Sequence, residues 1–295
     1  PKGEGMIDII DHILIAVPEL DGPVADYTKL TGRLPSWRGS HPGLGSVNAL
    51  FRFSNTYIEL VAPKGEGRFG DILRAHLEKN GAGIIGLAFG VEDAAGAAAF
   101  LREKGLSASD PLPGEGADES GALSPRRWKN VMLPPEETNG LFMFLIEQED
   151  RLALPFAPLV KEGEGRAAAE AIDHVVINTP DADSVIALLR GKLGLRLALD
   201  NTVKEWGVRQ IFFRTGRMTI EVISSLDEKK RAEEDHYWGI TFRYPDLTKA
   251  RARLLEADVP VSDIRKGRKK GTVVATPKGA TFGIPTLLLA PERKD

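Results

Sequence analysis

Two stretches of this chain share one sequence pattern, and the second begins 162 residues after the first. Residues 10–15 read IDHILI, and residues 172–177 read IDHVVI. Glu59 follows His12 by 47 residues, and Glu221 follows His174 by the same 47. The same offset also maps Pro18 onto Pro180 and Gly32 onto Gly194. Two equal His-to-Glu spacings with matching positions between them indicate a tandem duplication, each copy with one potential metal-ligand pair.

The length of 295 residues suits two domains of about 150 residues each. A composition of 42% hydrophobic and 27% charged residues is typical of globular proteins. We therefore predict an N-terminal domain over residues 1–148 and a C-terminal domain over residues 169–295. The stretch 149–168, which contains Pro155 and Pro158, is expected to link them.

Charge and composition exclude several classes of partner. The net charge of −3 and the lack of a concentrated basic face argue against nucleic acid, and we interpret the basic run at residues 265–270 as a solvated turn. The absence of cysteine excludes disulfides, zinc-thiolate sites and cysteine nucleophiles, and it suits a cytoplasmic protein. No apolar run approaches the roughly 18 residues of a membrane span, and no signal-peptide core is recognisable. A small-molecule substrate is the expected partner.

Hydrophobic periodicity predicts a strand, a helix and further strands in each of four units, and it places all four strands of the pattern in the third unit. In the first unit the strands are 9–17, 46–53 and 57–62, and the helix is 21–30, with a Gly- and Pro-rich segment at 33–45. A short helical stretch at 71–79 precedes the second unit, which has a helix at 93–103, strands at 84–91, 128–132 and 141–148, and a loop at 110–125. The third has strands 172–178, 195–199, 208–214 and 218–223 with a helix at 183–193. The fourth has strands 238–243, 272–275 and 286–289 with a helix at 247–257.

Only the first and third units carry the His and Glu pair. Gly86 and Gly239 stand where the other two units would have the histidine, and Phe144 and Leu287 replace the glutamate. The order is therefore liganded, blank, liganded, blank, in an α+β protein of four βαβββ modules in two duplicated halves.

This arrangement resembles the vicinal oxygen chelate superfamily, which includes glyoxalase I, extradiol dioxygenases and bleomycin-binding proteins. Residues 11–18 (DHILIAVP), 40–48 (SHPGLGSVN) and 57–63 (YIELVAP) resemble its glyoxalase-like branch in particular. The resemblance implies that modules pair edge to edge, that their mixed sheets curl into half-barrels, and that a divalent metal sits in the cleft.

The His and Glu pairs are candidate metal ligands. Alternation places His12 with Leu14 and Ala16 on one face of its strand, and Glu59 with Tyr57 and Val61 on one face of a second strand. The resemblance implies that these strands are neighbours, so that both side chains would reach one point. Asp11 and Asp173 are expected to point away from their His neighbours. Neutral imidazole and carboxylate suit Mn, Fe, Co, Ni or Zn. The simpler interpretation is a half-buried histidine that is hydrogen-bonded to a carboxylate.

How the modules pair decides the chemistry. If the first and third meet, within one chain or across a homodimer, His12, Glu59, His174 and Glu221 form one site. That set matches glyoxalase I of the bacterial type, where the resemblance makes Glu59 or Glu221 the general base. Three ligands of the set would suit an oxygenase. If each liganded module pairs with a blank one, a third ligand must come from elsewhere, or the site is metal-free.

Five further residues are candidates for substrate binding. His41 precedes Pro42-Gly43 in a loop that can fold over the cleft, and Asn48 shares a strand face with Leu50. Arg209 is a candidate for anion binding or a surface ion pair, and Trp206 for an apolar cleft wall. His236 has the wrong strand parity for a site role unless a bulge intervenes.

The pattern favours a metal-dependent lyase or isomerase that acts on a small, vicinally oxygenated substrate through a metal-stabilised enolate. An extradiol-type dioxygenase is the second hypothesis. The third is a metal-free protein that sequesters an aromatic compound, as bleomycin-resistance proteins do. The loop at residues 110–125 is a candidate lid, or else a plain surface insertion.

Overall fold

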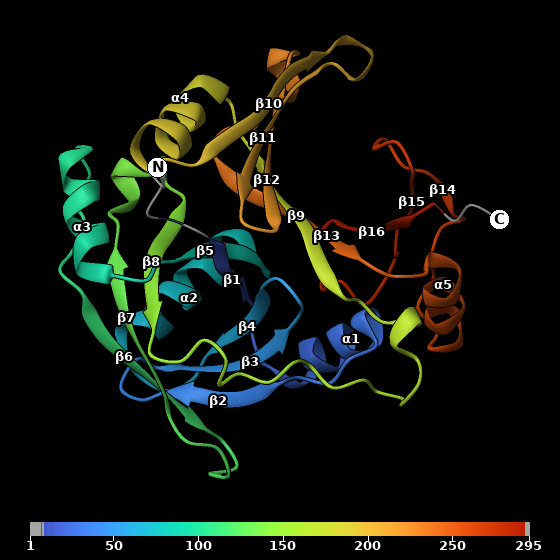
Figure 1. Cartoon of the computed structure of the whole chain (residues 1–295), viewed down its shortest axis with the longest axis horizontal. Coiled ribbons are helices and arrows are strands. Elements are labelled where there is room, and N and C mark those ends of the chain that lie inside the picture. Colours follow the sequence, from blue (N-terminus) through green and yellow to red (C-terminus); the bar gives the residue numbers. More distant parts are fainter. Residues whose placement is uncertain (1–6, 8, 293–295) are drawn as a thin grey trace.

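The computed structural model describes residue 7 and residues 9–292, and it has two halves of mixed α and β structure (Figure 1). Each half contains one eight-stranded sheet. Within the described residues, no helix combines the length and the apolar character needed to cross a membrane. The N-terminal half holds strands β1–β8, and the C-terminal half holds strands β9–β16.

The N-terminal half is a closed barrel in the order β1-β4-β3-β2-β6-β7-β8-β5. Strand β1 pairs in parallel with β4 and antiparallel with β5, so it lies between its own module and the next. The elements are β1 (Ile9–Ala16), α1 (Asp21–Thr31), β2 (Trp37–His41), β3 (Ser46–Arg52), β4 (Tyr57–Pro63), α2 (Arg68–Asn80), β5 (Gly83–Gly90), α3 (Ala94–Glu103), β6 (Leu112–Asp118), β7 (Arg126–Met132) and β8 (Phe142–Gln148).

Alternation along β1 separates two apolar environments. Ile13 and Ile15 face the core under the helices, whereas Leu14 and Ala16 point into the barrel with Phe144 of β8. His12 lies on the barrel face because it shares the parity of Leu14. The strand is buried on both sides, and its buried polar groups therefore need partners inside the protein.

The barrel closes where β2 pairs with β6, and we call this contact the seam. Its paired residues are Gly39 with Asp118 and Ser40 with Ala117. This half is therefore a full barrel rather than the half-barrel expected from the sequence. The prediction of a loop at residues 110–125 is also wrong in part, because β6 occupies residues 112–118. A Cβ atom on Gly39 would overlap the carbonyl oxygen of Ala117, and one on Gly114 would overlap the Trp128 ring. Glycine, which signalled a loop in the sequence, here permits close approach of strands and large rings.

The C-terminal half has the same strand order but does not close. Its sheet runs β10-β11-β12-β9-β13-β16-β15-β14, and the edge strand β14 has only two residues. The helix predicted at residues 183–193 is divided into a short α-helix and a π-helical stretch. The elements are β9 (Ala171–Asn178), α4 (Ala182–Ile186), the π-helix (Ala187–Lys192), β10 (Arg196–Val203), β11 (Val208–Thr215), β12 (Met218–Ser225), β13 (His236–Arg243), α5 (Leu247–Glu256), β14 (Arg265–Lys266), β15 (Thr272–Ala275) and β16 (Thr286–Pro291).

The two halves share one hydrophobic core. Phe242 of β13 packs against Tyr27 and Phe53 of the N-terminal half, with ring centroids 6.5 and 5.8 Å apart. The Tyr244 hydroxyl donates to the Leu30 carbonyl at 2.7 Å. Helices α1 and α5 lie together at this interface, where Arg253 also donates to the carbonyl of Leu30 (Figure 1). The domain division predicted at residues 149–168 remains a prediction, because the core crosses it.

Candidate functional site

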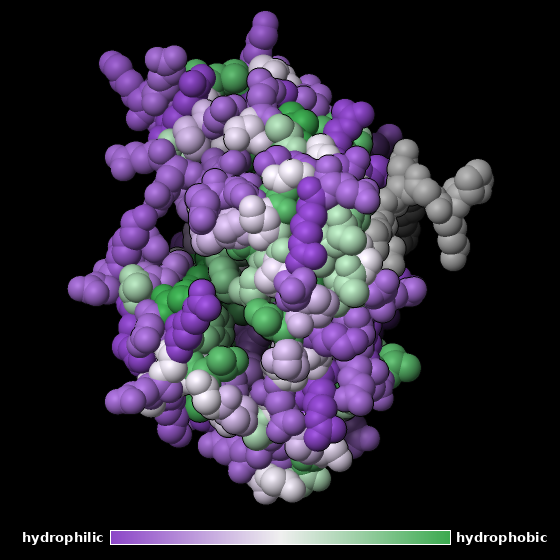
Figure 2. Space-filling model, turned by 90° about the vertical axis from the view of Figure 1, so that its left-hand side faces the viewer, coloured by the Kyte–Doolittle hydropathy of each residue, from purple (hydrophilic) through white to green (hydrophobic). Residues whose placement is uncertain are grey.

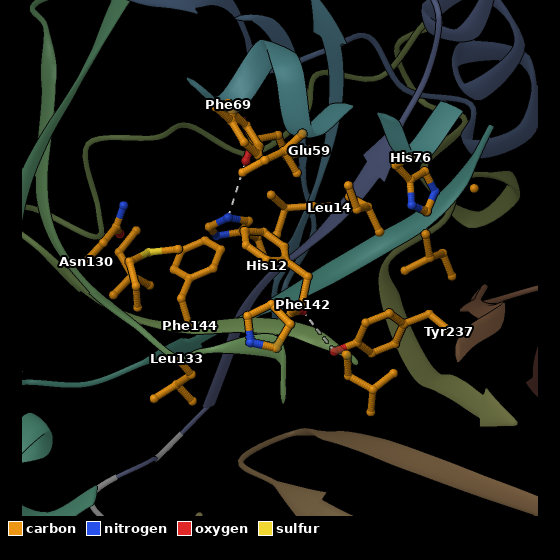
Figure 3. Close-up of a pocket in the computed structure, with 18 of the residues that line it drawn as sticks. His12, Leu14, Glu59, Phe69, His76, Asn130, Leu133, Phe142, Phe144 and Tyr237 are labelled. Carbon is orange, nitrogen blue, oxygen red and sulfur yellow. Dashed lines mark hydrogen bonds and ion pairs between the residues drawn. The ribbon is translucent and has the colours of Figure 1, made fainter. Parts of the chain in front are cut away.

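Three ionisable side chains converge inside the N-terminal barrel. The Nε2 atom of His12 lies 3.3 Å from Oε2 of Glu59, and Nε2 of His41 lies 3.4 Å from Oε1 of the same carboxylate. Their exposed fractions are 3%, 8% and 5% for His12, His41 and Glu59. Figure 3 shows His12 directed at Glu59, with Phe144 and Leu14 around the pair. His41 thus joins the pair although β2, not a covering loop, carries it.

The far nitrogen of each imidazole is also held. Nδ1 of His12 lies 2.8 Å from Oδ1 of Asp11, and Nδ1 of His41 lies 2.8 Å from Oγ of Ser46. Asn48 Nδ2 donates to Glu59 Oε1 at 2.8 Å. These partners fix both rings so that each Nε2 faces the carboxylate, as partners outside a coordination sphere do for metal-binding histidines.

Asp11 corrects an expectation from strand alternation. It was expected to point away from His12, but the pairing of β1 with β5 passes from Ile10 to His12 and leaves Asp11 as an extra residue. Asp173 is likewise skipped in the pairing of β9 with β13. A β-bulge re-aims the side chain of the extra residue, so each aspartate turns back to the histidine beside it.

Burial and hydrogen bonding act in opposite directions on this cluster. Burial favours neutral His12, yet contacts with Asp11 and Glu59 outweigh it and raise the pKa of His12 to about 9. Burial opposes ionisation of Glu59, but His12, His41 and Asn48 lower the pKa of that carboxyl to about 2. Burial lowers the pKa of His41. Without a metal, the site is therefore a His12 cation and Glu59 anion with neutral His41 beside them.

The donor types, two imidazoles and a carboxylate, are ones that suit a divalent transition-metal ion. Donor atoms bound at about 2.1 Å lie roughly 3.0–3.4 Å apart along the edges of octahedral or tetrahedral spheres, close to the two separations around Glu59. As they stand, the described residues contain no ready-made ion-holding group of three or more His, Asp or Glu side chains. The Glu59 carboxylate lies directly between the imidazoles, so an ion would enter only after a small displacement of that side chain.

A cavity of about 1440 Å³ opens from the cluster, which is larger than the roughly 300–1,000 Å³ of most small-molecule sites. Its inner wall includes Trp37, Tyr57, Arg126 and Trp128, and its outer part reaches His236 and other residues of the C-terminal half. Figure 3 shows this passage from His12 past Phe142 to Tyr237, whose hydroxyl donates to the Phe142 carbonyl at 3.1 Å. In Figure 2, apolar side chains surround a hollow in the molecular surface.

The C-terminal half holds a second, different cluster. His174 Nε2 lies 3.1 Å from Glu221 Oε2, and Asp173 holds Nδ1 at 2.9 Å. Here, however, Thr241 Oγ1 also contacts His174 Nε2 at 2.9 Å, whereas Ala88 stands opposite His12. Gln210 Nε2 donates to Glu221.

The position of Gln210 was readable in the sequence. The 162-residue offset maps Asn48 onto Gln210, and both amides donate to the glutamate of their own cluster, whereas the predicted candidate in this region was the adjacent Arg209. The same offset maps His41 onto Val203, which leaves the second cluster with only one imidazole. Arg209 lies outside it and pairs with Asp200 and Asp183.

The two remaining candidates for substrate binding, Trp206 and His236, are exposed residues. Trp206 is 43% exposed beside the second cluster, with the Arg268 guanidinium 3.6 Å from its ring centroid. His236 is exposed and starts β13 at the rim of the large cavity, next to a bulge at Trp238. Of the two module pairings left open by the sequence, the structure has the one in which each liganded module lies beside a blank one. His12 and His174 therefore lie in different sheets, and one chain forms no four-ligand site from both pairs.

Two protein-family models match this chain. A model described as "Glyoxalase-like domain" matches residues 10–166, and one described as "Glyoxalase/Bleomycin resistance protein/Dioxygenase superfamily" matches residues 173–276. The chain belongs to the glyoxalase-like family of the vicinal oxygen chelate superfamily. A curated relative, the ethylmalonyl-CoA/methylmalonyl-CoA epimerase of Cereibacter sphaeroides, is 33% identical over 142 residues, covering 48% of this chain and 98% of the relative.

Solved structures share the fold across nearly the whole chain. A variant of 4-hydroxymandelate synthase from Streptomyces coelicolor has a TM-score of 0.69 at 13% identity, covering 98% of this chain and 94% of that protein. The Mn(II)-bound glyoxalase from Novosphingobium aromaticivorans has a TM-score of 0.62 at 12% identity, covering 97% and 83%. At these identities the likeness extends to the fold alone.

Proposed function

We propose that the protein is a metal-dependent enzyme of the isomerase or lyase type whose active site is the N-terminal barrel. The observation that carries this proposal is the Glu59 carboxylate between two oriented imidazoles, at the inner end of a large cavity. His12 Nε2, His41 Nε2 and the Glu59 carboxylate would hold the ion. When bound, such an ion supplies Lewis-acid stabilisation of negative charge on a substrate carbonyl oxygen.

The residues of the chain then perform a proton transfer. Glu59 takes a proton from the carbon beside the carbonyl and returns it to the same or a neighbouring carbon, which completes the reaction without any further reactant. The low pKa of Glu59, about 2, makes it a weak base, so it acts only where charge on the substrate is well stabilised. Asp11 and Ser46 are positioning residues, because they contact only the imidazoles.

Two observations favour proton transfer over other chemistry. The epimerase relative, at 33% identity, is named for a change of configuration in acyl-CoA substrates. The cavity is also roomy enough for a reacting group with a long attached carrier. We infer that the substrate is a carbonyl compound with an acidic carbon-bound hydrogen.

The test is metal uptake combined with proton exchange. Protein purified without a His tag is expected to bind about one equivalent of Mn(II), and to exchange the acidic hydrogen of 2-oxo acid or acyl thioester probes for deuterium in D2O. His41→Ala should abolish both, because it removes one of only two imidazoles. His76→Ala is the matched control, since His76 lines the same cavity but pairs with Asn80 on α2. Failure of the wild-type protein to take up any divalent ion would rule the proposal out.

A second candidate is an Fe(II)-dependent dioxygenase. Two histidines and one carboxylate are also the donor set of non-haem iron oxygenases, and His12, His41 and Glu59 provide that set. Fe(II)-loaded protein would then consume O2 in the presence of substrate, which an isomerase does not. If neither metal uptake nor turnover is found, metal-independent ligand binding in the cavity becomes the surviving function.

A further inference from the structure

An arginine inside the barrel has no full set of partners. Arg126 of β7 lines the cavity, and its guanidinium lies 5.6 Å from the Tyr57 ring centroid and 5.8 Å from that of Trp37. Its Nη2 atom donates to Gln148 Oε1 at 3.4 Å, a long hydrogen bond. Its Nε atom is buried, and no hydrogen-bond partner for it exists in the described part of the chain.

A buried guanidinium group with a donor that lacks a partner destabilises the protein unless an anion binds to it. Removing a cation from water without a paired anion is unfavourable. Arginine presents its donors in a planar fork that matches the two oxygens of a carboxylate. The neighbouring residue, Arg127, meets its ordinary surface partner Glu115 at 3.1 Å. Arg126, by contrast, interacts with Tyr57 and lies in the field of Asp11 and Glu59, and its Nε atom keeps a donor that a ligand could use.

Arg126 is also connected to the proposed metal cluster. Gln148, which accepts from Arg126, donates from Nε2 to Asp11 Oδ1 at 3.2 Å and to the Tyr57 hydroxyl at 3.2 Å. Asp11 in turn holds His12. A ligand group bound to Arg126 would therefore lie in the chamber, the inner part of the cavity lined by His12, Glu59 and Arg126, together with the reacting end of the substrate.

Charge balance points the same way. With neutral imidazoles, Asp11 and Glu59 contribute two negative charges, which a divalent ion cancels. The positive charge of Arg126 is then the one charge in this tally that is not balanced. A substrate that brings one carboxylate neutralises it, and the cavity walls beside Arg126 are aromatic, with Trp37 and Tyr57 supplying stacking surfaces.

We propose that Arg126 binds a free carboxylate of the substrate, so that the substrate class is a carbonyl compound that also carries a carboxylate. This inference rests on the proposed function for the carbonyl half of the substrate and for the charge balance, whereas the unpartnered Nε atom of Arg126 is independent of it. Arg126 makes its contact with the unreacting end, which fixes the carbon-bound hydrogen relative to Glu59.

Binding of malonate, measured by calorimetry, tests the proposal without turnover. Wild-type protein should bind malonate, and malonamide, which has the same shape without charge, should bind at least about tenfold more weakly. Arg126→Gln should weaken malonate binding by about tenfold or more, and Arg126→Lys should restore part of it. Arg127→Gln is the matched control and should bind malonate as the wild type does. Equal affinity for malonate and malonamide in the wild type would overturn the proposal even if no variant folded.

Measurements on metal-free and Mn(II)-loaded protein separate the two hypotheses. Arg126-dependent malonate binding by protein that takes up no ion would support this inference and reject the proposed metal enzyme. Normal Mn(II) uptake with malonate affinity unchanged in Arg126→Gln would reject this inference and leave the metal enzyme standing.

Discussion

The two halves of this protein have the same strand order and the same His-Glu pair, yet only one forms an enclosed chamber. In the N-terminal half, the pairing of β2 with β6 closes a barrel around His12 and Glu59. In the C-terminal half, β10 and β14 stay apart, and His174 Nε2 is already engaged by Thr241. The two halves therefore share the ligand pair and differ in what surrounds it. The proposed site combines the pair with barrel closure and a second histidine, His41, and the C-terminal half has neither.

Loss of a histidine should reveal the largest difference between the two halves, measured as a change in Mn(II) affinity. His12→Ala is expected to lower Mn(II) affinity more than about 100-fold, because it removes a proposed ligand outright. His174→Ala should change that affinity less than about threefold. Isothermal titration with both variants measures the difference. Equal losses in the two variants would mean that the two pairs share one site, as they could across a dimer interface, and that the halves do not differ in metal binding.

The dependence of metal binding on pH should be the next largest effect. The pKa of His12 is raised to about 9 in the metal-free protein, so an ion must displace its proton below that pH. Affinity should rise about tenfold per pH unit from pH 7 and level off near pH 9. Glu59, with a pKa of about 2, stays ionised throughout and adds no slope.

Asp11→Asn provides the control for this pH dependence. It removes the carboxylate that raises the pKa of His12, so the plateau should begin at a lower pH. Asp173→Asn should leave the profile unchanged because Asp173 belongs to the other half. A flat profile in the wild type would show that His12 does not ligate the ion.

Substitution in the barrel seam should give a moderate loss of stability. Gly39→Ala places a methyl group against the Ala117 carbonyl and the Trp37 ring, and it should destabilise the protein by about 1–3 kcal/mol. Gly83→Ala is the matched control, because its methyl group would meet nothing within 4 Å, and should change stability by no more than about 0.5 kcal/mol. Urea unfolding measures both. Equal stability of the two variants would mean that the seam is not closed in solution.

The smallest effect is expected at the rim of the open half. Arg268→Ala removes the cation that lies on Trp206 and should cost no more than about 1 kcal/mol, since the ring is exposed. Lys270→Ala serves as the control and should be neutral. A loss of several kcal/mol in Arg268→Ala would show that this contact closes the C-terminal half much as the seam closes the other.

The sequence predicted what local patterns encode. The repeat located both His-Glu pairs, and alternation placed each pair on one side of its strands. Most strands and helices were found within a few residues, but β2, β6 and β14 were not predicted. Asp11 was misplaced because a bulge depends on the pairing of two strands, which one strand does not reveal. Asn48 was identified, but its counterpart Gln210 was missed by one position although the offset contained it.

Features made by distant strands could not be predicted. Closure of the barrel depends on β6, whose glycines read as a loop. The glycines allow Trp128 and Trp37 to fit against the backbone only after β2 and β7 have been brought together. Arg126 escaped notice for the same reason, since its burial depends on the barrel around it. His41 was a candidate in the sequence, but only the pairing of β2 with β3 brings it to Glu59.

The common core has a consequence for the handling of the gene. Phe242 and Tyr244 of one half are buried against Tyr27, Leu30 and Phe53 of the other. If the two halves were expressed as separate fragments, these rings would be exposed to solvent. Each fragment would then aggregate unless the two halves were produced together. The C-terminal half therefore covers apolar surface of the N-terminal half whether or not it has chemistry of its own.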